Sequence, residues 1–397
     1  MSETALGDRR PRLPLAELAN ALVAFLFAAS APVAIILAAG ARGGLTEADL
    51  ASWLFAAFAL NGALTIAMSA AFRQPLAFFW TIPGTVLVGA ALETLSLGEV
   101  VGAYLAAGFL LIVLGLTGWV KAAMDRLPMP IVMGMVAGVF LEFGLDWIRA
   151  FATDAALVAA MTATFVALSV APAVQRVVPP MIGVLVAGLA VLILQGEAPA
   201  LGAADRMLAA PQLYRPELSL AAMAELVVPL AVTVIAAQNA QGIVILRTAG
   251  HAPPVNAITT ACGAASMVTG PLGCVSTCLT GPSNAILVSS GRVERHWIAA
   301  VCLGLVAIAF GVFAPAVTHL LLATPTAFMA TLAGLALLRT LLAAFRTSFG
   351  GRFGLGAMIA FLVTVAGLPV ANIGAPFWGL VFGLATSLLL EREDFRA

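Results

Sequence analysis

Long apolar runs separated by short polar stretches fill almost the whole chain. Fourteen of these runs have the length that crosses a bilayer as a helix, about 17–25 residues, with seven on each side of a more polar stretch at 197–218. The predicted spans are 15–40, 47–71, 75–92, 98–120, 129–148, 154–173, 178–195, 220–246, 254–272, 273–290, 297–322, 325–345, 354–370 and 373–390. The pattern therefore predicts an all-α integral membrane protein with 14 transmembrane segments.

Prolines interrupt the third and the tenth of these spans. The third reads QPLAFFWTIPGTVLVGAAL over residues 74–92, and its later counterpart reads GPLGCVSTCLTGPSNAILVSS over 270–290. A helix-compatible apolar run begins only after Pro83 in the first segment and after Pro282 in the second. Proline suits the first turn of a helix and disrupts its interior. Each segment is therefore predicted to be an extended entry followed by a half-helix, at membrane depth.

Composition places the chain in the membrane. Hydrophobic residues make up 62% and charged residues 10%, whereas a soluble domain has about 45–50% apolar and about 25% charged residues. A net charge of zero argues against a nucleic-acid partner. No cleavable signal follows the polar first residues, and the first apolar run is long enough to remain in the bilayer.

The four cysteines all lie in apolar runs, and we interpret them as small packing residues. Cys274 and Cys278 have the spacing of a metal pair, but the chain has three histidines and none is near them in sequence. We therefore expect no metal and no cofactor. A membrane-embedded enzyme would need a nucleophile and base or a metal cluster at depth, and the scattered histidines offer neither.

Basic residues are distributed unevenly between the predicted loops. With a cytoplasmic amino terminus, fourteen Lys and Arg residues fall inside and four outside, which is a strong positive-inside bias. The inner set is Arg9, Arg10, Arg12, Arg73, Lys121, Arg126, Arg176, Arg247, Arg292, Arg295, Arg346, Arg352, Arg392 and Arg396; the outer set is Arg42, Arg149, Arg206 and Arg215. Arg339 lies within a span near its inner end. We expect cytoplasmic tails at 1–14 and 391–397 and a periplasmic linker at 197–218.

The two halves of the chain resemble each other. AELANALVAFLFAASAPVAIILAAG from Ala16 aligns with AELVVPLAVTVIAAQNAQGIVILRTAG from Ala224, and WTIPGTVLVGAA from Trp80 aligns with LTGPSNAILVSS from Leu279. Chance similarity among Ala-, Leu- and Val-rich helices is the alternative for the first match. Because seven is odd, the second half enters the membrane from the opposite side. Inverted repeats at 15–196 and 219–390, with broken helices in matching positions, are typical of a secondary transporter with its site at the midplane.

The predicted half-helix starts carry backbone donors suited to an anion. The candidate residues are Gly84 and Thr85 in the first segment and Ser283 and Asn284 in the second. A helix start combines partial positive charge with unsatisfied N–H groups, so two converging starts form an anion site without a cation. The alternative is that Thr85 and Ser283 only cap their helices.

Amides in the eighth span add a polar wall. Gln238, Asn239 and Gln241 occur within AAQNAQG, and buried amides are costly unless paired, so a cavity is indicated. Hydrogen bonding between helices is the alternative. Ser30 and Pro32 occupy the matching place in the first repeat and are predicted beside the same cavity.

Aromatic residues near the first half-helix suit an aromatic ligand. Phe79 and Trp80 lead into it, and Phe25 and Phe27 lie in the first span. Any one of them can instead face lipid or the protein core. The entry to the tenth span is smaller and more polar, and there Thr277 is a candidate hydrogen-bond partner of the ligand.

Carboxylates are scarce inside the predicted spans. Glu142 is the deepest of them and is the candidate for proton coupling. Its alternative is an ion pair with Arg149 or a position at the interface. His251 and His319 titrate near neutrality, but both are predicted in loops or at the interface. No metal ligand and no catalytic residue is predicted.

The motif QPLAFFWTIPG and the stretch AAQNAQGIVILRTAGHAPPVN resemble the benzoate:proton symporter (BenE) family of bacterial inner membranes, over nearly the whole chain. The resemblance implies two inverted repeats of seven spans, a fold shared with nucleobase permeases and sulfate/bicarbonate transporters. It implies a core domain at about 15–121 and 219–322 and a gate domain at about 126–196 and 324–390. It also implies proton-coupled uptake of benzoate or a related aromatic carboxylate by an elevator-like mechanism, and fold relatives suggest a homodimer.

The sequence differs from the nucleobase relatives at the site that the resemblance implies. Those relatives carry carboxylates on the eighth and tenth spans, where this chain has Gln238 or Asn239 and Asn284. Amides attract an organic anion, whereas a carboxylate in the site would repel it. An aromatic carboxylate is therefore favoured over uracil or xanthine. An anion exchanger or channel of the same fold, and a nucleobase:proton symporter, remain alternatives.

Overall fold

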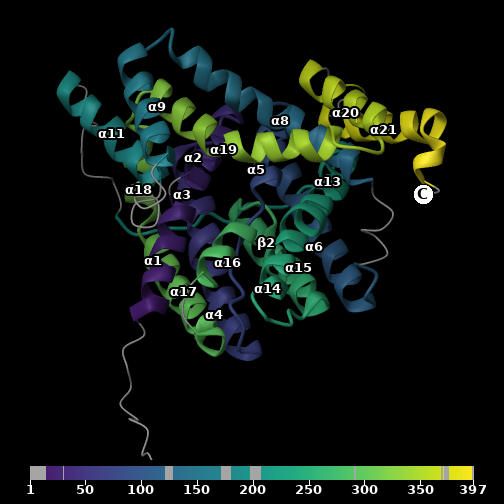
Figure 1. Cartoon of the computed structure of the whole chain (residues 1–397), viewed down its shortest axis with the longest axis horizontal. Coiled ribbons are helices and arrows are strands. Elements are labelled where there is room, and N and C mark those ends of the chain that lie inside the picture. The colour runs from purple at the N-terminus through teal and green to yellow at the C-terminus, as the bar shows by residue number, and fades with distance from the viewer. Residues whose placement is uncertain are drawn as a thin grey trace, which may run out of the picture.

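Helices form nearly all of the structure, a computed structural model, and they lie in two groups (Figure 1). The described residues are 15–29, 31–120, 128–170, 180–196, 207–289, 292–367, 370 and 375–395. Ser30, the predicted tail at 1–14 and the first ten residues of the predicted linker at 197–218 lie outside them.

The larger group contains both proline-interrupted segments, and we call it the strand-bearing group. Its elements in the first half of the chain are α1 (Leu15–Ala29), α2 (Ala31–Arg42), α3 (Glu47–Phe55), η1 (Ala56–Leu60), α4 (Asn61–Phe72), β1 (Phe78–Trp80), α5 (Ile82–Ala91) and α6 (Leu97–Thr117). Those in the second half are α12 (Leu220–Ala222), η2 (Met223–Val227), α13 (Val228–Val232), η3 (Thr233–Asn239), α14 (Ala240–Thr248), α15 (Val255–Thr269), η4 (Gly270–Leu272), β2 (Thr277–Leu279), α16 (Gly281–Leu287), η5 (Val293–Arg295), α17 (His296–Val312) and α18 (Ala314–Leu322).

The second group covers one side of the first, along the top of Figure 1, and we call it the flanking group. It consists of α8 (Met129–Ala150), α9 (Ala155–Val170), α11 (Pro180–Gln195), α19 (Thr326–Phe349), α20 (Gly354–Ala366) and α21 (Ala375–Leu390); the short η6 (Arg392–Phe395) follows. The long helices α8 and α19 pack against each other, and α19 also reaches α2 of the strand-bearing group.

The helices only partly match the predicted span lengths. Among the described residues, seven helical runs are long and apolar enough to cross a membrane, and five further apolar helices are shorter. α20 has 13 residues because it ends at the left-handed Gly367, fewer than the pattern predicted, whereas α9, α11 and α21 have 16 described residues each and end or begin where the described residues do. The predicted span 297–322 is two helices, because Pro315 starts α18 directly after α17 ends.

The two interrupted segments have the form that their prolines predict. Each consists of a three-residue strand and a short helix, β1 then α5 and β2 then α16, with proline in the first turn of the helix. The two strands pair antiparallel, with Phe79 opposite Cys278 and Trp80 opposite Thr277. Segments about 200 residues apart therefore lie side by side, and the two half-helices start from opposite ends of the short strand pair.

Two helix pairs, each made of one helix from the first half of the chain and one from the second, approach each other through glycine. α4 packs on α17, where a Cβ on Gly304 would lie 2.6 Å from the carbonyl oxygen of Gly62. α6 packs on α15, where a Cβ on Gly263 would lie 2.5 Å from the carbonyl oxygen of Gly108. Both contacts need a residue without a side chain, which lets the helix backbones touch. Both helix pairs that join the two halves are therefore held by close backbone contact at glycine.

Candidate functional site

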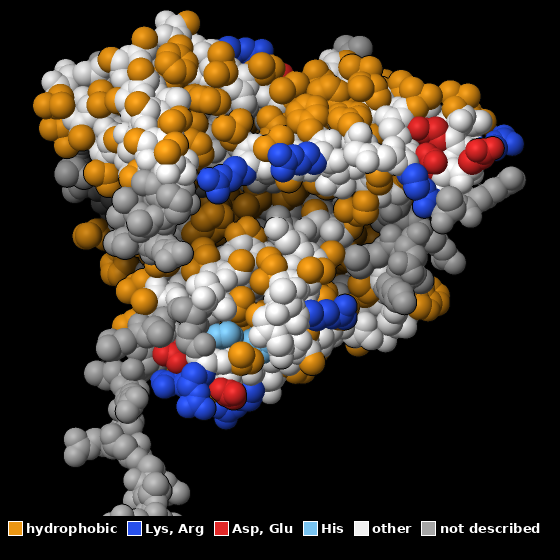
Figure 2. All heavy atoms as spheres, in the orientation of Figure 1, with side chains coloured by type: hydrophobic (Ala, Val, Ile, Leu, Met, Phe, Trp, Pro, Cys, Tyr) orange, Lys and Arg blue, Asp and Glu red, His pale blue; other side chains and the backbone are white. Residues whose placement is uncertain are grey.

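A cavity of about 400 Å³ lies between the two helix groups, beside the two strands. Figure 2 shows a hollow at this boundary, with Lys and Arg side chains along its upper edge. The lining residues come from both halves of the chain: Phe27, Ala28, Pro32, Phe79, Trp80, Ile82, Pro83, Met129, Met133, Val136, Ala236, Ala237, Gln238, Gln241, Thr280, Pro282, Ser283, Arg339, Ala343 and Thr347. The size is that of a small-molecule site.

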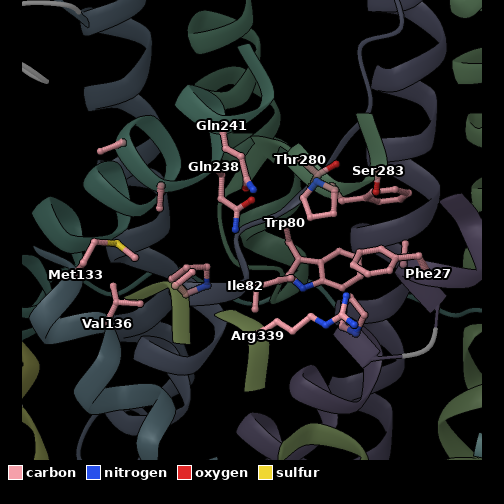
Figure 3. A pocket seen from close by; sticks show the side chains of 18 of the residues that line it. Phe27, Trp80, Ile82, Met133, Val136, Gln238, Gln241, Thr280, Ser283 and Arg339 are labelled. Carbon is pink, nitrogen blue, oxygen red and sulfur yellow. The ribbon is translucent and has the colours of Figure 1, made fainter. Parts of the chain in front are cut away.

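One wall of the cavity is aromatic. Trp80 and Phe79 reach it from β1, and Phe27 reaches it from α1 (Figure 3). The Trp80 ring is held edge-on against Phe58, with ring centroids 5.1 Å apart, so its position is set by packing. Its indole nitrogen is buried and has no hydrogen-bond partner among the described residues. Phe25, on the same helix as Phe27, instead packs against Phe58 and Phe310 and does not line the cavity.

Two amides form the wall opposite. Gln238, at the end of the π-helical stretch η3, and Gln241, in α14, both line the cavity, as the sequence predicted for their shared helix face. Figure 3 shows both carboxamides directed toward the centre of the cavity. A Cβ on Gly281 would lie 2.5 Å from the carboxamide carbon of Gln241, so glycine at the start of α16 makes room for this amide. π-Helical turns are frequent at functional sites because they shift the helix register.

The predicted backbone donors are mostly bonded within the chain. The N–H of Gly84 donates to the Thr81 hydroxyl at 3.2 Å, and the N–H of Thr85 donates to the Thr81 carbonyl at 2.9 Å. The N–H of Asn284 donates to the Thr280 carbonyl at 3.2 Å. Gly84 and Thr85 do not line the cavity, whereas Ser283 does. The start of α5 is thus capped by its own Thr81, because a threonine at this position satisfies the first free donors.

Three other predicted site residues form hydrogen bonds within the broken segments or between them and neighbouring helices. The Asn239 side-chain oxygen accepts the N–H of Leu279 at 2.7 Å, and the Asn284 side chain bonds both backbone groups of Ala77, at 3.1 and 3.2 Å. The Thr277 hydroxyl donates to Asn61 at 2.8 Å. None of these three side chains lines the cavity. Asn239 satisfies a backbone group of β2 and Asn284 satisfies those of Ala77, directly before β1, as the membrane interior requires of buried polar groups.

The cavity also contains a cation that the sequence reasoning did not assign to it. Arg339 projects from α19 toward Trp80 (Figure 3), and the described residues give it no hydrogen bond or ion pair. No Asp or Glu is among the lining residues. The signal in the sequence was its position, since Arg339 is the one basic residue that the charge pattern left inside a predicted span. Met133 and Thr347, from the same helix group, were also missed.

Glu142, the predicted proton-coupling residue, lies in a different place. It lines a second cavity of about 390 Å³, together with Arg42 and Phe143, on the opposite side of the broken segments. Arg149 pairs with Glu142 at 3.1 Å and with Asp146 at 3.2 Å, and Arg42 pairs with Asp146. The guanidinium of Arg42 also lies 4.8 Å from the centroid of the Phe143 ring. Arg42 and Glu142 thus have ion-pair partners within the protein, whereas the exposed Glu93, which also lines the second cavity, has none among the described residues.

The histidines lie away from both cavities. The rings of His251 and His296 approach to 3.1 Å, and His319 lies 3.1 Å from Glu47. Burial and the neighbouring His296 lower the pKa of His251, which lies in the loop after α14. Within the described residues, no group of His, Cys, Asp and Glu is arranged to hold a metal ion.

Comparison with known proteins identifies the family of the chain. The family model described as "Benzoate membrane transport protein" (BenE) matches residues 12–389. The chain is 29% identical to the inner membrane protein YdcO of Escherichia coli strain K12, over 96% of this chain and 99% of that protein. It is 28% identical to the benzoate membrane transport protein of Acinetobacter baylyi, over 93% of each.

The solved structures extend the comparison at the level of fold. The murine anion transporter SLC26A9 in its inward-facing state superposes with a TM-score of 0.66 at 13% identity, covering 97% of this chain and 69% of that chain. At that identity the likeness concerns the fold alone.

Proposed function

Because the chain belongs to the BenE family of benzoate membrane transport proteins, we propose that it takes up benzoate or a related aromatic carboxylate together with a proton. It is a membrane transporter and not an enzyme. The benzoate membrane transport protein of Acinetobacter baylyi, with which it shares 28% identity, supports the choice of substrate class.

The observation that carries the proposal is the composition of the first cavity. An aromatic wall of Phe27, Phe79 and Trp80 faces the amides of Gln238 and Gln241, and no carboxylate lines the space between them. The ring of the substrate packs on the aromatic wall. The amide N–H groups, with the Ser283 hydroxyl, meet a carboxylate without repelling it.

The fold supports an elevator-like cycle. In this proposal the chain has fourteen spans in two inverted repeats, a core domain at about 15–121 and 219–322, and a gate domain at about 126–196 and 324–390. The antiparallel pairing of β1 with β2 and the equivalent glycine contacts support the repeat. The first cavity lies where core and gate meet, so sliding of the core against the gate carries the substrate across.

The orientation follows from the charge pattern. Both termini are placed in the cytoplasm of a cell whose inner membrane holds the protein, as for the inner membrane protein YdcO. The cavity residues Met129 and Met133 then lie at the cytoplasmic end of α8, and Ala343 and Thr347 at the cytoplasmic end of α19. The cavity therefore opens inward, which agrees with the inward-facing state of its structural relative.

Proton coupling is assigned to a residue outside the first cavity. Glu142 remains the candidate, although its position in the second cavity separates it from the substrate and its side chain pairs with Arg149. A homodimer through the gate domain is the proposed assembly. The remaining predicted residues, Gly84, Thr85, Asn239, Asn284 and Thr277, act by holding the half-helices in place.

Uptake into proteoliposomes tests the proposal. Vesicles with an acidic exterior and a neutral interior should accumulate labelled benzoate without any internal counter-anion, and a protonophore should abolish the accumulation. Empty vesicles with the same gradients are the control, because benzoic acid itself crosses membranes. Uptake that ignores the pH gradient and requires an internal anion contradicts symport. That result would favour an anion exchanger, the second candidate that the likeness to an anion transporter supports.

A further inference from the structure

The geometry points to a carboxylate clamp made by Arg339 and the indole N–H of Trp80, one from each helix group. We propose that these two donors bind the carboxylate of the substrate and that this contact forms only while the cavity faces the cytoplasm. The inference rests on the proposed function and deepens it, since it names the groups that recognise the charge of the substrate.

The first observation behind the clamp is the position of Arg339 within α19. Arg339 lies ten residues before Phe349, the end of α19, which is about 15 Å along the helix axis. A cation so far from a helix end is costly in a membrane unless it faces water, a partner or a ligand. Arg339 lines the cavity, no Asp or Glu lines it, and the described residues supply no ion pair for the guanidinium. The guanidinium is exposed to the open cavity, where an anionic ligand supplies an opposite charge.

The second observation is the indole N–H of Trp80, which is buried without a hydrogen-bond partner among the described residues. The Trp80 side chain is 2% exposed. A buried donor without a partner loses the hydrogen bond that water would give it. Figure 3 shows this nitrogen on the side of the ring that faces Arg339. The two donors therefore converge on one region of the cavity.

The two donors come from parts that move relative to each other in the proposed cycle. Trp80 belongs to the strand-bearing group, which carries the substrate, and Arg339 belongs to α19 of the flanking group. The guanidinium meets the carboxylate only when the strand-bearing group is at the cytoplasmic end of its path. Beside a guanidinium a carboxylate is held ionised. Arg339 therefore keeps the bound substrate in its anionic form on the cytoplasmic side.

Binding of benzoate to the purified protein in detergent, followed by isothermal titration calorimetry, tests the clamp. Arg339→Gln should weaken benzoate binding roughly 10–100-fold, the loss expected for a charge-assisted hydrogen bond. Arg339→Lys should restore part of the affinity because it keeps the charge without the forked donors. Trp80→Phe, which keeps a ring and removes the N–H, should weaken binding about tenfold.

Arg346→Gln is the matched control, since Arg346 lies on the same helix, is exposed and does not line the cavity. It should bind benzoate as the wild type does, and the melting temperature without ligand should be unchanged in the Arg339 and Arg346 variants. Unchanged affinity in Arg339→Gln, with a wild type that binds benzoate, overturns the clamp and leaves the transport function standing. A wild type that binds neither benzoate nor any other aromatic carboxylate overturns both.

Discussion

The two cavities have nearly the same volume, about 400 and 390 Å³, but their charged groups are arranged in opposite ways. In the first cavity a single cation, Arg339, faces amides and aromatic rings without a carboxylate. In the second, Arg42 and Glu142 are both engaged in ion pairs that include Asp146 and Arg149. The Arg339 side chain of the first cavity has no ion pair among the described residues, whereas Arg42 and Glu142 in the second cavity are each paired with a charged side chain.

The positions of the two cavities help to explain the difference between their charged groups. Both lie between the strand-bearing and flanking groups, on opposite sides of the paired strands. An alternating-access protein needs one side open and the other closed at any time. The first cavity has the composition of an open binding site, and the ion pairs of the second link α2 with α8 across the group boundary. In the proposed cycle the second cavity is the external passage, and these ion pairs join its two walls.

A negative charge in the first cavity gives the largest expected effect. Gln238→Glu places a carboxylate within reach of the substrate's own carboxylate, and a like charge about 5 Å away costs roughly 3 kcal/mol, on the order of 100-fold in affinity. Calorimetric titration with benzoate measures it. Gln212→Glu, in an exposed loop, makes the same change outside the cavity and should bind benzoate normally. Equal losses in both variants would contradict a specific effect of the cavity.

Removing an ion pair from the second cavity should shift the conformation. Asp146→Asn breaks the contacts of Asp146 with Arg42 and Arg149, and because these ion pairs are partly exposed the shift in population should be modest. The readout is labelling of Val139→Cys, a residue that lines the second cavity, by an impermeant maleimide added outside cells that carry the Cys302→Ala background.

The control for this shift is Arg215→Gln, an exposed position outside both cavities. It should leave the labelling rate of Val139→Cys unchanged, whereas Asp146→Asn should raise it. A rate that stays constant in Asp146→Asn would show that these ion pairs do not hold the external passage closed.

The aromatic wall gives the smallest expected effect. Phe27→Leu removes a ring from the first cavity and should weaken benzoate binding by about 1 kcal/mol, roughly fivefold. Phe25→Leu makes the same change two residues away, in a side chain that packs against Phe58 and Phe310 instead. The difference in benzoate affinity between these variants measures the contribution of the wall. If Phe25→Leu loses as much as Phe27→Leu, the ring contributes through packing and not through contact with the substrate.

Much of this arrangement was predictable from local patterns. Apolar length located most of the helices to within a few residues, and proline in a helix-compatible run located both half-helices and their extended entries. The pairing of Gln238 with Gln241 followed from helical spacing, since residues three apart share a face. These features depend on the chain's own covalent geometry and on its transfer from water to lipid, and both are local properties of the sequence.

The direction of each polar side chain needed the folded structure. Asn239 follows Gln238 directly, yet it turns to the backbone of Leu279, because the edge of β2 must be satisfied and the π-helical turn sets which amide reaches it. Arg339 looked like a residue near a membrane surface until α19 was packed beside Trp80. Glu142, the predicted proton-coupling residue, lies in the second cavity because of how α8 packs, and its sequence position did not indicate this. A side chain's partner can lie 200 residues away, and only the packing of the helices decides which one it meets.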